Sequence, residues 1–142
     1  MDISELKDAD EFTLEGNFLK CKVIDVYDGD SITIIFPFGG KYWKKKCRLY
    51  GIDTPETRTR SLDEKQAGLL AKGRLCNYIL DKVVWIDFRK WDKYGRLMGI
   101  IYLDEEKTEN VCQKMIKEGH AYEYFGKTKR KFSEWYVKTN VL

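Results

Sequence analysis

The sequence predicts an α+β domain that is mainly β, with five strands and about three helices. Its 142 residues, 43% of them hydrophobic, suffice for one core but not comfortably for two domains. Segments that alternate between apolar and polar residues, or that are rich in β-formers, lie on both sides of one long segment with helical periodicity. Turn residues separate these segments, and no internal repeat or low-complexity linker interrupts them. These three observations favour a single, mainly β domain.

Charge is distributed unevenly along the chain. Residues 1–16 contain six acidic side chains and one lysine, which gives a charge of −5. Because the whole chain carries +3, residues 17–142 carry +8. We expect residues 1–16 to form an acidic N-terminal tail or short docking segment, and residues 17–142 to form the folded domain. A basic body suits a polyanionic partner, although charge alone is better explained by an ordinary solvated surface.

Three strands are expected before the first helix. Phe18–Tyr27 has strand character, with a change of phase near Ile24 that indicates a bulge. Asp28-Gly29 is a hairpin signal, and Ser31–Phe36 then alternates between apolar and polar residues. Tyr42–Tyr50 is the third strand. Pro37 and the Gly39-Gly40 pair are expected to end the second strand, and the third is expected to direct Trp43, Cys47 and Leu49 to one face and Lys44, Lys46 and Arg48 to the other.

Helices and two further strands follow. Ser61 and Glu64 fit a capping box at the start of a helix that ends near Leu80. Val83–Arg89 and Leu97–Leu103 are the fourth and fifth strands. The remaining elements are a short helix over Asn110–Glu118, capped at its C-terminus by Gly119, and a last helix with Phe132, Trp135 and Tyr136 on one face. Five strands in this order, closed by helices, form most economically the barrel of an OB-fold.

Other features exclude several classes of protein. No segment is long and apolar enough to span a membrane, and the acidic N-terminus does not resemble a secretory signal, so we expect an intracellular protein. A single histidine and the absence of a Cys-x-x-Cys pair argue against a zinc site. The four cysteines lie in apolar patterns and are expected to be buried thiols rather than disulfide partners: Cys21, Cys47, Cys76 and Cys112.

Chemically distinctive residues gather at the end of the third strand. Arg48 offers a fixed charge and a fork of donors suited to a phosphate. Asp53 and Glu56 flank Thr54-Pro55, where the proline restricts both its own backbone and that of Thr54, so the carboxylates are held on a stiff turn. We expect two other pieces, Asp28-Gly29-Asp30 and Asp92-Lys93-Tyr94-Gly95-Arg96, to meet this turn at one site.

The three motifs, in this order, resemble those of the staphylococcal nuclease (thermonuclease) family. They are Asp-Gly-Asp, Arg-Leu-x-Gly-Ile-Asp-Thr-Pro-Glu-Thr and Asp-Lys-Tyr-Gly-Arg, and the resemblance extends from about residue 20 to about residue 135. It implies an OB-fold and the metal-assisted hydrolysis of phosphodiester bonds in DNA, RNA or both. We expect a monomer that prefers single-stranded nucleic acid and does not act at a membrane.

The resemblance also implies the roles of individual residues. Asp30, Asp53 and the carbonyl of Thr54 would hold Ca²⁺, with Mg²⁺ and Mn²⁺ as alternatives, since hard oxygen ligands suit these ions. Glu56 would be the general base that activates water, and Arg48 and Arg96 would neutralise charge in the phosphoryl transition state. Side chains that would contact the nucleotide are Lys93, Tyr94, Tyr122 and Tyr124, with Phe125 as an alternative because the register after the second helix is ambiguous.

A second interpretation is a binding module. An OB-fold with a basic face can bind nucleic acid without cutting it, and some nuclease-like domains that lack catalytic residues serve as scaffolds. The residues that discriminate are the implied catalytic and metal-binding set, and all of them are present here. The sequence therefore favours the enzyme.

Overall fold

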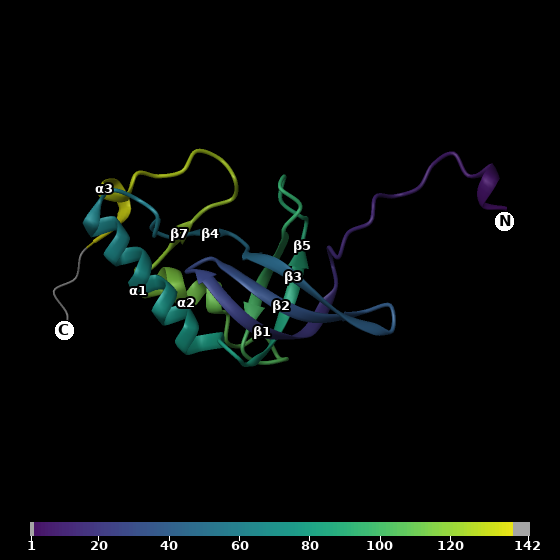
Figure 1. Cartoon of the computed structure of the whole chain (residues 1–142), viewed down its shortest axis with the longest axis horizontal. Helices are drawn as coiled ribbons and strands as arrows, with labels where there is room; N and C mark the ends of the chain where they lie inside the picture. The colour runs from purple at the N-terminus through teal and green to yellow at the C-terminus, as the bar shows by residue number, and fades with distance from the viewer. Residues whose placement is uncertain (1, 138–142) are drawn as a thin grey trace.

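A closed barrel of five strands forms the centre of the computed structural model, which describes residues 2–137 (Figure 1). The order around the barrel is β1-β2-β3-β6-β5, in which only the β3–β6 pair is parallel. This architecture is the expected α+β OB-fold. The strands are β1 (Phe18–Asp28), β2 (Ser31–Phe38), β3 (Lys41–Leu49), β5 (Val83–Arg89) and β6 (Leu97–Tyr102).

Helices close the barrel on the side away from the N-terminal segment (Figure 1). A small second sheet, which the sequence did not predict, pairs β4 with β7. Each of its strands has two residues, too few for an alternating pattern to be recognised. The elements outside the barrel are η1 (Ile3–Glu5), β4 (Ile52–Asp53), α1 (Leu62–Ile79), α2 (Val111–Lys117), β7 (Tyr122–Glu123) and α3 (Phe132–Trp135). No helix in the described range 2–137 has the length and apolar character needed to cross a membrane.

The first three strands follow the sequence pattern with one correction. The register of β1 against β2 shifts between Val23 and Asp25, which confirms the bulge expected at Ile24. The second strand was expected to end at Pro37 and the Gly39-Gly40 pair; the Pro37 part is wrong, because β2 continues to Phe38, and the glycine pair follows directly after its end. Strand β2 pairs with β1 only as far as Ile35 but pairs with β3 along its whole length. At Pro37, therefore, β3 is the one neighbouring strand of β2. A proline is tolerated at such an edge position.

The core fills the barrel, and most of it comes from the inward positions of the strands. Cys47 and Leu49 are buried as expected, whereas Trp43, on the same face nearer the β2–β3 turn, is 44% exposed. All four cysteines are free thiols, and Cys76 corrects the expectation of four buried thiols because it is only partly buried. Leu14 also belongs to the core.

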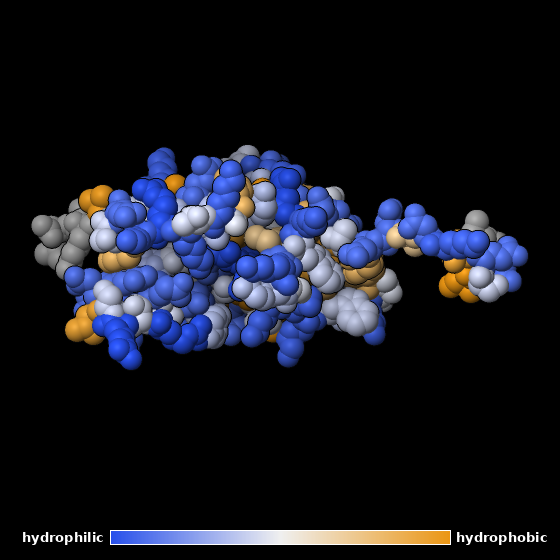
Figure 2. Space-filling view, turned by 90° about the horizontal axis from the view of Figure 1, so that it is seen from above, coloured by the Kyte–Doolittle hydropathy of each residue, from blue (hydrophilic) through white to orange (hydrophobic). Residues whose placement is uncertain are grey.

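The N-terminal segment projects from the body in both views of the molecule, and hydrophilic side chains dominate the face seen in Figure 2. Its last part contacts the barrel, because Phe12 lies edge-on to Phe38 and Trp91 at ring distances of 5.3 and 6.1 Å. Together with the buried Leu14, this contact shows that packing begins before residue 17. The division of the chain into a tail and a domain stays a prediction.

Helix ends match the capping residues in the sequence. The Ser61 hydroxyl accepts the N–H of Glu64 at the start of α1. At the end of α2, Gly119 has φ +81° and donates its N–H to Ile116, while His120 donates to Met115. This pair of bonds is a Schellman motif, and it confirms the cap at Gly119.

The capping box of α1 differs from the expectation in a way that matters for the site. The Glu64 carboxylate does not return to the backbone of Ser61 but accepts the N–H of Glu56 at 3.1 Å. Gly68, one turn further along α1, lies against the same loop. A Cβ on Gly68 would be 2.8 Å from the carbonyl oxygen of Pro55 and 3.0 Å from that of Glu56. The N-terminal half of α1 therefore fixes the backbone that carries Glu56.

We expect Gly68→Ala to destabilise the protein, because the added methyl group forces the loop away from α1. Overpacking of this kind costs about 1–3 kcal/mol, which outweighs the gain of about 1 kcal/mol from replacing a helical glycine. Gly73→Ala is the matched control, since Gly73 lies in the same helix with no atom within 4 Å of the new Cβ. It should raise the free energy of unfolding by about 0.5–1 kcal/mol. Urea unfolding of both variants tests this, and equal stabilisation by the two would contradict the close contact.

Candidate active site

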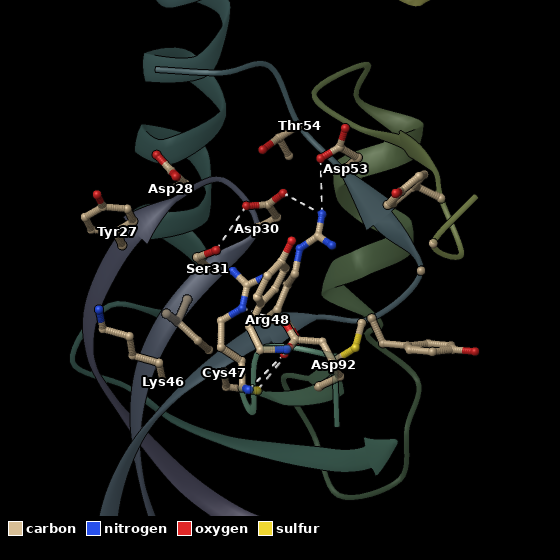
Figure 3. A pocket seen from close by; sticks show the side chains of 18 of the residues that line it. Tyr27, Asp28, Asp30, Ser31, Lys46, Cys47, Arg48, Asp53, Thr54 and Asp92 are labelled. Carbon is tan, nitrogen blue, oxygen red and sulfur yellow. Dashed lines mark hydrogen bonds and ion pairs between the residues drawn. The ribbon is translucent and has the colours of Figure 1, made fainter. Parts of the chain in front are cut away.

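A cavity of about 800 Å³ lies between the outer face of the barrel, the turn after β4, and the segment that follows β7. Figure 3 shows carboxylates and a guanidinium converging in it from different parts of the chain. The lining includes every residue that the sequence implied for the site except Tyr122. The structure therefore brings the three sequence motifs together. The predicted residues in its wall are Asp30, Arg48, Asp53, Thr54, Glu56, Lys93, Tyr94, Arg96 and Tyr124.

Arg48 links the two aspartates. Ser31 and Arg48 are register partners across β2 and β3, so Asp30, at the start of the hairpin, lies beside the guanidinium. One nitrogen, Nη2, donates to Asp30 at 3.2 Å and to Asp53 at 3.1 Å (Figure 3). The same nitrogen donates to the carbonyl oxygen of Ile52 at 3.2 Å. The Arg48 side chain is 12% exposed. Its position is therefore set by three acceptors, two of them on β4 and one in the turn between β1 and β2.

Burial and charge act against each other in this group. Burial lowers the pKa of Arg48, but Asp30 and Asp53 outweigh it, so the guanidinium has a raised pKa and stays charged. Burial also raises the pKa of Asp53, and the Tyr122 hydroxyl and nearby cations only partly offset this. Asp53 thus lies in an environment where additional positive charge would favour its ionised form.

Tyr122 contacts Asp53 through its hydroxyl group. The hydroxyl donates to Asp53 Oδ2 at 2.7 Å and accepts the backbone N–H of Arg130 at 3.0 Å. Burial and the bond to Asp53 raise the pKa of Tyr122 to about 12. The ring is buried against Trp135, with 4.8 Å between ring centroids. Tyr122 therefore orients Asp53, and its nucleotide contact stays a prediction.

Glu56 lies at the rim of the cavity, with a side chain that is 57% exposed. Its backbone is held by Glu64, and its carboxylate is 3.6 Å from the ammonium group of Lys129. Burial raises the pKa of Glu56; Lys129 opposes this shift, whereas the neighbouring acids add to it. A carboxylate held in this way, with access to water, has the features of a general base.

Arg96 is held by Asp92 on the opposite wall. Its Nε donates to Asp92 at 2.5 Å, and the same carboxylate accepts the backbone N–H groups of Tyr94 and Arg96. Burial raises the pKa of Asp92, but the hydrogen bonds from Arg96 and Tyr94 outweigh burial, so the pKa is lowered. Tyr94 is 73% exposed, and the ammonium of Lys93 lies 5.2 Å from the centre of its ring. The turn thus presents a cation and an exposed ring to the cavity.

Tyr124 and Phe125, two of the three residues between which the sequence left the nucleotide contact open, both border the cavity. Tyr124 lines the cavity, with the Arg48 guanidinium carbon 5.7 Å from its ring centre, and its hydroxyl donates to the carbonyl of Lys127. Phe125 also borders the cavity but packs against Tyr50, with 5.5 Å between ring centroids. Both residues are therefore available to a ligand, and Tyr124 lies closer to the charged group.

Lys129 is the site residue that the sequence specified least. The sequence places it in the basic run Lys127, Lys129, Arg130 and Lys131, which fits backbone contacts or a solvated surface equally well. In the structure its ammonium lies 3.6 Å from both Asp53 and Glu56. Asp28, to which no role has been given, also lies in the wall of the cavity. The Thr57 hydroxyl donates to its carboxylate at 2.8 Å, and burial raises the pKa of Asp28. No spacing in the sequence distinguishes Lys129 from the other charges of its basic run, whereas Asp28 belongs to the Asp-Gly-Asp motif.

The oxygen atoms of the site suit a hard divalent cation. Among residues 2–137 no three His, Cys, Asp or Glu side chains form a metal cluster. Asp30 and Asp53 nevertheless converge on a single positively charged nitrogen of Arg48, so the two carboxylates can share a cation. With the Thr54 carbonyl they supply oxygen donors alone, which is the chemistry of Ca²⁺ or Mg²⁺ sites rather than zinc sites.

Comparisons with known proteins agree with this arrangement. Residues 46–139 match the family described as Staphylococcal nuclease homologue. The Thermonuclease of Staphylococcus hyicus is 32% identical over 115 residues, covering 80% of this chain and 64% of that protein. The Micrococcal nuclease of Shigella flexneri is 27% identical over 114 residues, covering 75% of this chain and 60% of that protein. An uncharacterised protein of Methanocaldococcus jannaschii is 31% identical over 124 residues, covering 72% of this chain and 58% of that protein. The chain thus spans less than two thirds of the length of these relatives.

Fold and site together define an OB-fold protein whose barrel carries an arginine-lined, carboxylate-rich cavity on its outer face. The family match covers more than half of the chain and includes most of this cavity. The chain belongs to the staphylococcal nuclease homologue family.

Proposed function

We propose that the chain is a nuclease that hydrolyses phosphodiester bonds of DNA, RNA or both, with a divalent cation, Ca²⁺ in the first place. The observation that carries the proposal is the content of one cavity. It holds a solvent-accessible carboxylate, two guanidinium groups and an aspartate pair that shares a cationic partner: Glu56, Arg48, Arg96, Asp30 and Asp53. Membership of the family and the printed activities of the named relatives support the same function.

Each residue has a distinct role in the proposed reaction. Glu56 accepts a proton from the water that attacks phosphorus, which requires its ionised form. Arg48 and Arg96 bind the phosphate oxygens and neutralise the charge that grows there in the transition state. Asp30, Asp53 and the Thr54 carbonyl would hold the cation, which when bound polarises a phosphate oxygen and helps to orient the water.

The walls of the cavity favour a single-stranded substrate. Tyr94 and Tyr124 offer aromatic rings to unpaired bases, and Lys93 adds a charge for the backbone. Stacking on these rings is sequence-tolerant, so we expect the proposed enzyme to have little base specificity. A monomeric state and an intracellular location stay predictions.

A binding module is the alternative function, and cleavage distinguishes the two. We expect labelled single-stranded DNA or RNA to be cut in the presence of added Ca²⁺, Mg²⁺ or Mn²⁺, and cutting to stop when a chelator is added. The assay also ranks the ions and the two nucleic acids. Retention of the oligonucleotide without cleavage, with all three ions, would overturn the nuclease and leave the binding module.

A further inference from the structure

Asp53 is surrounded by cationic and hydrogen-bonding partners. Its Oδ1 lies 3.1 Å from Arg48 Nη2 and 3.6 Å from Lys129 Nζ, and its Oδ2 accepts the Tyr122 hydroxyl. The Lys129 ammonium is also 3.6 Å from Glu56 Oε1. A side chain from the segment after β7 therefore connects the proposed cation ligand with the proposed base.

We propose that Lys129 sets the cation affinity of this site by competing with the divalent ion for Asp53 and Glu56. The inference rests on the proposed function, because it takes Asp53 as a ligand of the ion. Two positive charges cannot approach the same carboxylate without repelling each other. The ammonium and the ion therefore compete for Asp53, and the energy of the two contacts that the ammonium loses is subtracted from the energy of ion binding.

Lys129, rather than Arg48, is the cation that can leave. Its side chain is 52% exposed, so it can turn into water without leaving a buried charge behind. The Arg48 side chain is 12% exposed and also bonds to Asp30 and to the Ile52 carbonyl. Arg48 is thus fixed by the barrel, while Lys129 occupies the accessible side of the acids.

The backbone keeps Lys129 close to the site after its side chain is displaced. The neighbouring Arg130 N–H donates to the Tyr122 hydroxyl, and the Lys127 carbonyl accepts the Tyr124 hydroxyl. These two bonds tie the segment on both sides of Lys129 to the site. The ammonium therefore returns to Asp53 and Glu56 whenever the ion dissociates, which makes the competition persistent.

Calcium titration by calorimetry of the full chain and of Lys129→Gln tests the proposal directly. We expect Lys129→Gln to bind Ca²⁺ about threefold to tenfold more tightly, since one exposed cation with two contacts is removed. The difference should shrink at high salt, where the repulsion is screened. Lys127→Gln is the matched control: it removes the same charge from the same segment, and Lys127 makes no ion pair with any described residue. Its Ca²⁺ affinity should stay within about twofold of the parent.

Thermal unfolding with and without Ca²⁺ provides a second measurement that does not depend on activity. Stabilisation at a fixed Ca²⁺ concentration should be larger in Lys129→Gln than in the parent or in Lys127→Gln. Equal affinity and equal stabilisation in all three proteins would overturn the competition. Unchanged Ca²⁺ affinity with a raised KM in Lys129→Gln would also overturn it, and would make Lys129 a phosphate contact. If the parent protein bound none of Ca²⁺, Mg²⁺ and Mn²⁺, the proposed cation site itself would fail.

Discussion

Glu56→Gln is expected to lower kcat about 10²–10⁴-fold, the usual contribution of a positioned general base. The amide cannot accept the proton of the attacking water but keeps the shape of the carboxylate. The loop should stay in place, because it is held by the Glu64 carboxylate on the backbone N–H of residue 56 and by contact with Gly68. Single-turnover cleavage of a labelled oligonucleotide measures the effect. Glu123→Gln, which changes an exposed glutamate on β7, is the control and should retain full activity.

The same variant should lose the acid limb of the pH profile. Burial raises the pKa of Glu56 above its usual value of 4.5, with Lys129 opposing and the nearby acids adding to the shift. Because the ionised carboxylate is the active form, kcat/KM should rise with pH through this raised pKa and fall when the pH drops below it. Full activity of Glu56→Gln would exclude Glu56 as the base, whereas an acid limb that persists in a weakly active variant would point to another carboxylate with a raised pKa, such as Asp53.

Arg48→Lys should lower kcat about 10²–10³-fold, like the loss of one transition-state donor. One nitrogen of Arg48 bonds to Asp30, Asp53 and the Ile52 carbonyl, and the rest of the guanidinium stays available to a phosphate. Lysine keeps the charge but lacks the planar fork, so it cannot make both sets of contacts at once. Arg89→Lys is the matched control, because Arg89 is exposed and, within residues 2–137, forms an ion pair only with Asp87, at 3.6 Å. Retention of more than a tenth of the activity in Arg48→Lys would contradict the role of the fork.

Loss of the charge itself should also be visible in stability. In Arg48→Gln the two aspartates lose the cation that lies between them, and breaking a buried ion pair costs up to about 3–5 kcal/mol. Added Ca²⁺ should restore part of this loss, since the ion supplies the missing positive charge. Urea unfolding of parent and variant, each with and without Ca²⁺, measures the restoration.

The barrel was predictable because its signals are local. Alternation in Ser31–Phe36, the hairpin at Asp28-Gly29 and the cap at Gly119 each depend on a few adjacent residues, and the structure bears out all three. The convergence of Asp30, Arg48 and Asp53 was predictable from the motifs, and register pairing of Ser31 with Arg48 explains why Asp30 lies beside Arg48. The effect of Pro37 was misjudged, because a strand tolerates a proline only where one of its sides has no neighbouring strand, and the sequence does not show where that is.

The remaining features depend on side chains that meet only after folding. Nothing local marks Tyr122 as the partner of Asp53, 69 residues earlier in the chain. Glu64 has the spacing of a capping box, and its contact with Glu56 arises only because the loop folds back onto α1. Lys129 is one of several lysines in a basic run, so its proximity to both acids could be found only from the structure.

The anchoring of the Glu56 backbone on α1 has a consequence for how members of such a fold can diverge. Glu64 and Gly68 hold the base from the helix, while the exposed residues Arg58 and Arg60 belong to a connection that runs onward to Ser61. Insertions and deletions in a surface connection are tolerated when its ends are fixed independently. Changes in loop length after Thr57 can therefore reshape the mouth of the cavity without moving the base. Substrate preference and chemistry can evolve separately in this architecture.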